Sequence, residues 1–253
     1  MSGVHGEDGL AGWLATAQGQ YVLRWEQERF DAMVADIFGY NALQLGLPAF
    51  DFLRASRIAF RFASGTPPAG QITTEAHALP FATGSLDLVV LPHVLEFAEH
   101  PHQVLREVER VLVPEGSVIL TGFNPYSLWG LRRTVARRSS GLPWRGHFFS
   151  PLRIKDWLTL LSFETQTAGF GCYAPALASE RWLGRWRFMD RAGGRWWPVC
   201  GGVYLLHGIK RVQGMRLIAP SWRDRKAKRN GLAPVARRGR GAIGGARKSG
   251  TDT

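Results

Sequence analysis

The stretch that decides the fold reads EAHALPFATGSLDLVVL over residues 75–91 and HQVLREVERVLVPEGSVILT over residues 102–121. Leu86 to Leu91 is an apolar run of the kind found in a central parallel strand, which is covered on both faces. His102 to Leu112 has apolar residues on one face of a helix and charged residues on the other. Ser117 to Thr121 is a second buried strand. Strand, helix and strand in this order predict a βαβ unit with a right-handed crossover.

Helices and strands alternate on both sides of this unit as well. Hydrophobic spacing predicts helices over residues 19–38, 48–56 and 151–161. Strands are predicted over residues 41–46, 58–62, 72–75, 163–168 and 202–210. Residues 124–149 are irregular, and residues 170–198 are rich in Trp and Arg. The alternation predicts an α/β fold with a mostly parallel sheet, in which ligands bind beyond the carboxyl ends of the strands.

The chain has 253 residues, enough for one α/β domain with a sizeable core and a tail. Its formal net charge is +12, and residues 220–253 carry ten Lys or Arg against two Asp, so two-thirds of the excess lies there. No apolar run approaches the ~20 residues that cross a bilayer. The N-terminus lacks the basic start and apolar stretch of a signal peptide. We therefore expect a cytoplasmic protein in which Cys172 and Cys200 are reduced, buried thiols.

Four consecutive blocks of the sequence carry a family resemblance. They are Glu75–Phe81, Gly84–Val90, His93–Phe97 and Leu105–Gly116. In order and spacing they resemble the central block of type 11 methyltransferases, which belong to the class I, S-adenosylmethionine-dependent methyltransferases. Weaker matches extend the resemblance over roughly residues 41–210. The N-terminal stretch Gly19–Pro48 resembles a bacterial subgroup of such proteins.

The resemblance implies a Rossmann-like, seven-stranded, mostly parallel sheet with helices on both faces and S-adenosylmethionine at its strand ends. It implies a helical segment over residues 1–40, a methyltransferase-like domain over residues 41–212 with an insertion at 123–200, and a disordered basic tail over residues 220–253. Glu75 would accept hydrogens from the adenine amino group, and Ala76 would offer its backbone amide. Leu91 and Pro92 would line the methyl-transfer site. The implied cofactor-binding residues are Gly46, Glu75, Ala76, Leu91 and Pro92, with no catalytic residue or metal assigned.

The first motif of the family is altered in this chain. Gln44 stands in place of the usual acid, and Pro48 and Phe50 stand where glycines allow the backbone to approach the ligand closely. Residues 58–64 contain no acid that could hold the ribose hydroxyls. Gln44 keeps both donor and acceptor capacity. Two hypotheses follow: a methyltransferase with an unidentified acceptor, or a non-catalytic binding module on the same fold, associated with nucleic acid through its tail.

His93 lies just after the apolar strand and is a candidate general base or a residue of the acceptor pocket. Methyl transfer to a reactive acceptor requires mainly the alignment of the reacting atoms, so a base is not essential. His93, His100 and His102 lie near Glu96 and Glu99, and imidazole with carboxylate suits several metals. The family has no metal in this stretch, so none is expected.

Four arginines follow the predicted strand of residues 117–121, and they either bind an anionic acceptor or form a solvated basic face. They are Arg132, Arg133, Arg137 and Arg138. The tryptophans between Trp129 and Trp197 could stack on a base or line an acceptor pocket, but packing of the insertion against the sheet is favoured. The glycine-rich basic tail would attract nucleic acid or an anionic surface weakly, or would simply aid solubility.

Overall fold

The computed structural model describes residues 9–65, 70–136, 141–176, 186 and 188–212. The chain divides into a unit of residues 1–212 and a second unit of residues 213–253. The second unit contains the predicted basic tail, which lies outside the described residues, as do Arg137 and Arg138.

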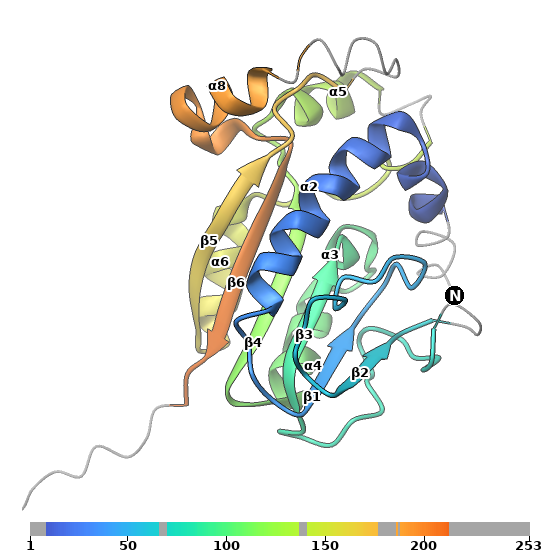
Figure 1. The fold of residues 1–253 in the computed structure, drawn as a ribbon, viewed down its shortest axis with the longest axis vertical. Coiled ribbons are helices and arrows are strands. Elements are labelled where there is room, and N and C mark those ends of the chain that lie inside the picture. Colours follow the sequence, from blue (N-terminus) through green and yellow to red (C-terminus); the bar gives the residue numbers. More distant parts are fainter. Residues whose placement is uncertain (1–8, 66–69, 137–140, 177–185, 187, 213–253) are drawn as a thin grey trace, which may run out of the picture. The chain divides into compact units, whose positions relative to one another are not determined.

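Six strands form the central sheet of the first unit, in the order β2-β1-β3-β4-β6-β5. Strands β1 to β4 are parallel, and β6 runs antiparallel to both β4 and β5. The strands are β1 Asn41–Gln44, β2 Phe60–Ala63, β3 Leu86–Pro92, β4 Leu112–Phe123, β5 Phe163–Gly171 and β6 Val203–Lys210. The sheet confirms the predicted mostly parallel α/β fold (Figure 1).

The seventh expected strand is reduced to two isolated bridges. Ile72 pairs with Ser64 in parallel, and Glu75 pairs with Ala78 across a turn. Ile72 is the one large aliphatic residue in the predicted strand 72–75, and Thr73 and Glu75 are exposed. This edge of the sheet therefore has little apolar surface that could hold a longer strand in place.

Helices cover both faces of the sheet. On one face lies helix α2 (Ala17–Val34), together with the loop after β1. On the other face lie α4 (Pro101–Val111) and α6 (Pro151–Leu160). Alternate residues of the central strands supply the two cores: Leu88, Val90 and Ile119 contact the α2 layer, and Val89, Leu91, Val118 and Leu120 contact the α4 and α6 layer. The molecule therefore has three layers, as the sequence predicts.

Two helices begin with the caps that their sequences offer. The Thr16 hydroxyl accepts the amide of Gly19 at the start of α2, and the Ser150 hydroxyl accepts the amide of Arg153 at the start of α6. The Ser150 cap thus fixes the start of α6 at Pro151, as the predicted helix over residues 151–161 requires. A side-chain acceptor here satisfies amides that have no partner within the helix.

The predicted helix over residues 48–56 is wrong, because this segment consists of turns and bends. Two expected irregular regions contain helices instead: α5 (Leu128–Ala136) and α8 (Phe188–Trp196), the latter followed by the 3-10 turn η1 (Pro198–Cys200). The spacing of apolar residues does not predict helix α5, because the helix buries Trp129 on one side and exposes Leu131 on the other. Its apolar residues therefore do not form a single stripe.

One of the two predicted buried thiols is exposed. Cys172 is buried, whereas Cys200 lies on the surface in η1, and both are free. None of the helices within the described ranges combines the length and the apolar character that crossing a membrane requires.

Candidate functional site

The loop after β1 is organised by the side chain of Gln44. Its amide nitrogen donates to the carbonyls of Gly46, Leu47 and Phe50 at 3.2, 3.1 and 2.7 Å, and its oxygen accepts the Phe52 amide at 2.9 Å. Gln44 is 2% exposed. An acid at this position could accept but could not donate to three carbonyls. The exchange of acid for amide is thus matched to this particular loop.

Gly46 turns the chain at the carboxyl end of β1 with a φ of 76°. Its amide donates to the Ser64 hydroxyl at 2.8 Å, which ties the loop to the end of β2. Leu47 follows with a φ of 47°, a value that is uncommon for a residue with a side chain. The loop is therefore a defined structure built on hydrogen bonds, and it uses the backbone groups that a helix from Pro48 would need.

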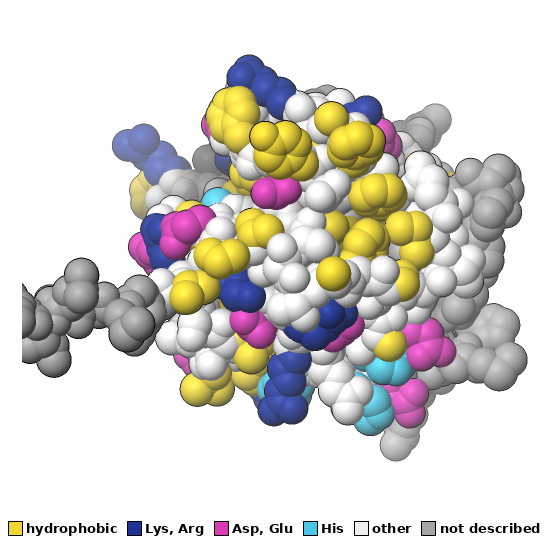
Figure 2. All heavy atoms as spheres, turned by 90° about the horizontal axis from the view of Figure 1, so that it is seen from below, with side chains coloured by type: hydrophobic (Ala, Val, Ile, Leu, Met, Phe, Trp, Pro, Cys, Tyr) yellow, Lys and Arg dark blue, Asp and Glu magenta, His cyan; other side chains and the backbone are white. Residues whose placement is uncertain are grey.

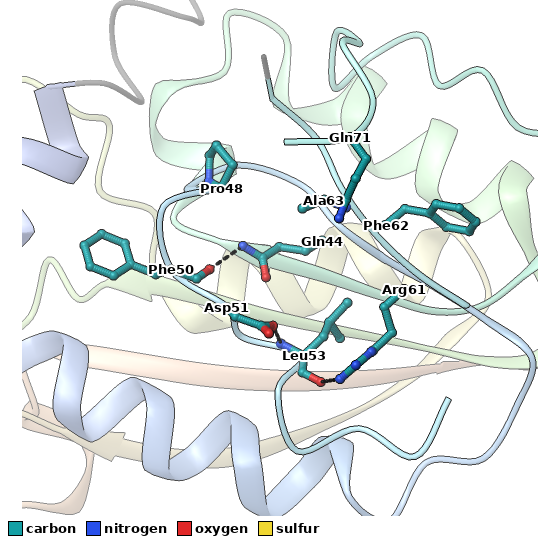
Figure 3. A pocket seen from close by; sticks show the side chains of 9 residues that line it. All are labelled: Gln44, Pro48, Phe50, Asp51, Leu53, Arg61, Phe62, Ala63 and Gln71. Carbon is teal, nitrogen blue, oxygen red and sulfur yellow. Dashed lines mark hydrogen bonds between the residues drawn. The ribbon is translucent and has the colours of Figure 1, made fainter. Parts of the chain in front are cut away.

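A pocket of about 270 Å³ opens between this loop and β2. Figure 3 shows its lining: the polar side chains of Gln44, Asp51, Arg61 and Gln71, and the apolar side chains of Pro48, Phe50, Leu53, Phe62 and Ala63. Pro48 and Phe50, the residues that replace glycines, stand at its wall and leave it open. Asp51 and Arg61 are exposed, and Arg61 also donates to the Leu53 carbonyl at 3.1 Å. Opposite charges and apolar surface thus meet in one hollow.

The structure places the five predicted cofactor residues in different settings. Gly46, Leu91 and Pro92 are buried at the carboxyl ends of β1 and β3. Ala76 is partly buried against the core, and the Glu75 side chain is 68% exposed, 3.2 Å from Nε2 of His77. None of the five lines the pocket itself, although Gln71 lies four residues before Glu75. Cofactor binding by these five residues therefore stays a prediction, and the pocket itself is lined by other residues.

His93 forms the centre of a buried ionic cluster immediately after β3. Its Nε2 lies 2.8 Å from Oε1 of Glu26 in α2, and its Nδ1 lies 2.6 Å from Oε2 of Glu96. The side chains of His93, Glu26 and Glu96 are all at most 2% exposed. The second oxygen of Glu96 accepts the amide of Phe123. The Glu26 carboxylate is therefore fully buried although it is ionisable, and the group beside it is the His93 imidazole.

The protonation of this cluster follows from its surroundings. Burial alone lowers the pKa of His93, but the carboxylates of Glu26 and Glu96 outweigh it and raise that pKa from 6.5 to about 10. Burial raises the pKa of Glu96 above its ordinary 4.5, against the opposing effect of His93. His93 is therefore a protonated partner of two carboxylates. The burial of His93 and the carboxylates beside both of its ring nitrogens leave neither nitrogen open to a substrate.

Aromatic side chains cover the carboxyl ends of β3 and β4. Phe123 is the centre: the rings of His93, Phe148 and Trp129 stack on it with centroids at 4.2, 5.0 and 6.0 Å. Trp129 and Trp144 are buried, which confirms the packing role for these two tryptophans. Two of the arginines lie on this cover, Arg132 over Trp144 at 4.9 Å and Arg133 over Phe148 at 5.0 Å. Their guanidinium groups thus stack on aromatic rings instead of forming a freely solvated face.

The chemistry of the pocket fits a nucleoside ligand that also carries an amino-acid group. The Asp51 carboxylate can accept hydrogen bonds from hydroxyl, amino or ammonium groups, the Arg61 guanidinium can hold a carboxylate, and Phe62 offers an apolar face. Asp51 and Arg61 were missed by sequence reasoning, which looked for the ribose acid on β2. The position of Asp51 could not be predicted from the sequence, because only the fold of the loop places Asp51 beside β2. Within the described part of the chain, no three His, Cys, Asp or Glu side chains could hold a metal ion.

Comparison with curated proteins gives two relatives that match parts of the chain. Residues 53–120 match the family model described as "Methyltransferase domain". The uncharacterized protein YafS of Escherichia coli is 36% identical over 132 residues, which are 51% of this chain and 54% of YafS. The malonyl-acyl-carrier-protein O-methyltransferase of Halorhodospira halophila is 39% identical over 61 residues, 24% of this chain and 21% of that enzyme. The matches thus span about half the length of the first relative and a fifth of the second.

Solved structures share the fold at low sequence identity. An S-adenosylmethionine-dependent methyltransferase from Thermotoga maritima has a TM-score of 0.54 at 17% identity, over 75% of this chain and 92% of its own. One from Archaeoglobus fulgidus has a TM-score of 0.53 at 14% identity, over 75% and 93%. The 4+2 cyclase SpnF has a TM-score of 0.50 at 14% identity, over 77% and 82%. The chain thus has the fold of class I, S-adenosylmethionine-dependent methyltransferases, and residues 53–120 in its central segment match the methyltransferase domain model.

Proposed function

We propose that this chain is an active methyltransferase that uses S-adenosylmethionine and transfers its methyl group directly to an acceptor. The observation that carries the proposal is the open pocket between the β1 loop and β2. It lies at the carboxyl edge, where a sheet of this kind binds its ligands. It persists although Pro48 and Phe50 replace glycines there, and this favours the enzyme over the non-catalytic module.

The residues that would hold the cofactor combine the predicted set with the pocket lining. Glu75 would accept from the adenine amino group beside the Ala76 amide. Asp51 would take the ribose hydroxyls in place of the acid that β2 lacks, and Arg61 would pair with the carboxylate of the methionyl group. Gly46, Leu91 and Pro92 would shape the strand ends behind them. When bound, S-adenosylmethionine would supply an electrophilic methyl group.

The protein would contribute alignment more than proton transfer. His93 is enclosed by Glu26 and Glu96, so the acceptor would need to present a nucleophile that is reactive without that imidazole. Direct displacement depends on the alignment of nucleophile, methyl carbon and sulfur, and a rigid strand end achieves this.

Isothermal titration with S-adenosylhomocysteine tests the first step of this function. We expect binding by the wild-type chain and about tenfold weaker binding by Glu75→Gln, since a hydrogen bond to a charged group contributes about 1.5–3 kcal/mol. Glu99→Gln is the matched control, because Glu99 is an equally exposed carboxylate away from the pocket. Absence of binding by the wild-type chain would favour the non-catalytic module, and equal affinity of the two variants would remove Glu75 from the site.

The domain organisation of the chain follows the family resemblance. We propose that residues 41–212 are the methyltransferase-like domain, preceded by the helical segment 1–40 and followed by a tail that makes weak contacts with nucleic acid or an anionic surface. A cytoplasmic location is supported by the exposed free thiol of Cys200, which suits a reducing compartment.

A further inference from the structure

Seven large hydrophobic side chains are exposed where α5 and the end of α8 lie. They are Tyr126, Leu128, Leu131, Val135, Trp196, Trp197 and Val199, here called the cap surface, with exposures of 46–83%. Figure 1 places α5 and α8 together at one end of the molecule. The Asn124 side chain joins the two parts, because its nitrogen donates to the carbonyls of Val199 and Gly201 at 2.8 and 3.0 Å. The cap surface is therefore one feature with a fixed base.

Helix α5 has the form of an interfacial helix. Leu128, Leu131 and Val135 are spaced by three and four residues, so they share one helical face, and that face is exposed. Trp129 on the opposite side anchors the helix through its Nε1, which donates to the Ala174 carbonyl at 2.9 Å. The helix is thus held by one face while its second apolar face has no partner within the described residues. Burying that face would be favourable in any apolar environment.

The charge of the described side chains in the two segments that carry the cap surface, residues 124–149 and 172–200, is mainly of one sign. These side chains include four arginines, no lysine and one acid, Asp190; the arginines are Arg132, Arg133, Arg145 and Arg195. Asp190 is already engaged by the Tyr21 hydroxyl at 2.5 Å and the Tyr173 amide at 3.0 Å. Arg195 is exposed directly beside Trp196. Exposed apolar and aromatic side chains among arginines match a surface that is apolar inside and anionic outside.

We propose that the cap surface binds the headgroup region of an anionic phospholipid membrane, with α5 lying in the interface. Leu128, Leu131 and Val135 enter the acyl boundary, Trp196 and Trp197 lie at headgroup level, and the exposed Arg195 pairs with a lipid phosphate. Tryptophan is enriched at this depth because its ring is amphipathic. This inference goes beyond the proposed methyl transfer and does not depend on cofactor binding.

The aliphatic residues favour a membrane over nucleic acid. Stacking on bases needs aromatic rings, and phosphate contacts need only the arginines, so neither explains exposed Leu131 and Val135 on one face. The surface at the amino ends of β1 and β2 differs from the cap surface. Phe38, Tyr40 and Phe60 are exposed there, but Figure 2 shows acidic and basic side chains interspersed with hydrophobic ones on that face. That surface lacks the single sign of charge that an anionic surface requires.

Cosedimentation of the full chain with vesicles tests the proposal. Vesicles of phosphatidylcholine alone are compared with vesicles that also contain phosphatidylglycerol. We expect binding to the anionic vesicles, and about a tenfold smaller partition coefficient for Leu131→Ser with Val135→Ser, because two partly buried aliphatic side chains are lost. The matched control is Leu152→Ser with Leu160→Ser, which removes two equally exposed leucines from α6. All these proteins keep the same basic tail and the same charge, so the control should stay within about twofold of wild type.

Four results would overturn the proposal. The first is equal vesicle binding by the cap variant and the α6 variant. The second is binding that does not depend on the anionic lipid. The third is self-association of the wild-type chain in light scattering that the cap variant abolishes, which would make the cap surface an interface between copies. Preferential binding of a single-stranded RNA, lost in the cap variant while vesicle binding is absent, would assign the surface to nucleic acid. Circular dichroism of each variant checks that the fold is retained.

Discussion

Replacing His93 by glutamine should destabilise the protein severely, because it leaves two carboxylates buried without a counter-charge. Glu26 and Glu96 are at most 2% exposed, and each has an oxygen within 2.8 Å of the imidazole. Glu96 would retain the Phe123 amide as a donor, whereas Glu26 has no other partner among the described residues. Removing one partner of a buried ion pair costs about 3–5 kcal/mol. That is a large share of the total stability of a domain, about 5–15 kcal/mol.

Urea unfolding followed by circular dichroism measures the loss. The loss should shrink as the pH falls from 6.5 towards 5, because the contribution of His93 to the wild type is complete there while the stranded carboxylates of the variant can take up protons. His207→Gln is the matched control: His207 is partly buried and its Nε2 lies 3.1 Å from the Ser117 hydroxyl, with no carboxylate involved. Its loss should be about 1 kcal/mol, the usual contribution of one hydrogen bond.

A triple variant separates charge from shape. Glu26→Gln, His93→Gln and Glu96→Gln together remove all three charges while nearly preserving volume, so this variant should recover much of the stability lost by His93→Gln alone. A His93→Gln variant no less stable than His207→Gln, with the same loss at pH 6.5 and pH 5, would refute the reasoning. It would mean that the cluster is not charged in the folded protein.

Two further variants and one pH series test the loop after β1, helix α8 and the His93 cluster. Gln44→Glu, which restores the acid usual in the family, should destabilise the protein at least as much as Gln44→Ala, about 3 kcal/mol in urea unfolding, since the three carbonyls would lose their donor; a stabilising Gln44→Glu would contradict the loop geometry. Because the pKa of His93 is raised from 6.5 to about 10, its contribution to stability is complete below pH 6.5 and is lost as the pH rises towards 10. The free energy of unfolding should therefore fall between pH 7 and pH 10 more steeply in wild type than in the triple variant, and equal slopes would argue against it. Asp190→Ala should release α8 from Tyr21 and Tyr173 and increase proteolysis near Arg195, while Asp156→Ala on α6 should not; unchanged cleavage would show that Asp190 does not hold the helix.

The central strands could be predicted because their residues are apolar on both faces. Leu86–Leu91 and Ser117–Thr121 fall within β3 and β4, and Val203–Lys210 forms β6 as expected. The sequence could not show that 48–56 avoids a helix, because the decisive hydrogen bonds come from the Gln44 side chain, outside that segment. Local propensity yields to such tertiary contacts.

The candidate site was predicted less completely than the fold. Glu26 has the spacing of a surface residue on α2. Its carboxylate has a buried partner only because the fold places His93 beside it, just after β3 and just before α3 (Val94–Phe97). Asp51 stands in a loop whose course depends on Gln44. Glu26 lies far in sequence from His93, and the position of Asp51 beside β2 depends on the fold of the loop, so a pattern read along the chain contains no sign of either placement.

A crystal structure of the chain with S-adenosylhomocysteine tests the central claim most directly. We predict that the nucleoside lies at the carboxyl ends of β1 and β2, with its adenine amino group against Glu75 and its ribose hydroxyls against Asp51. A pocket closed by Pro48 and Phe50, with the ligand absent at saturating concentration, would contradict the claim that this family fold still holds its cofactor.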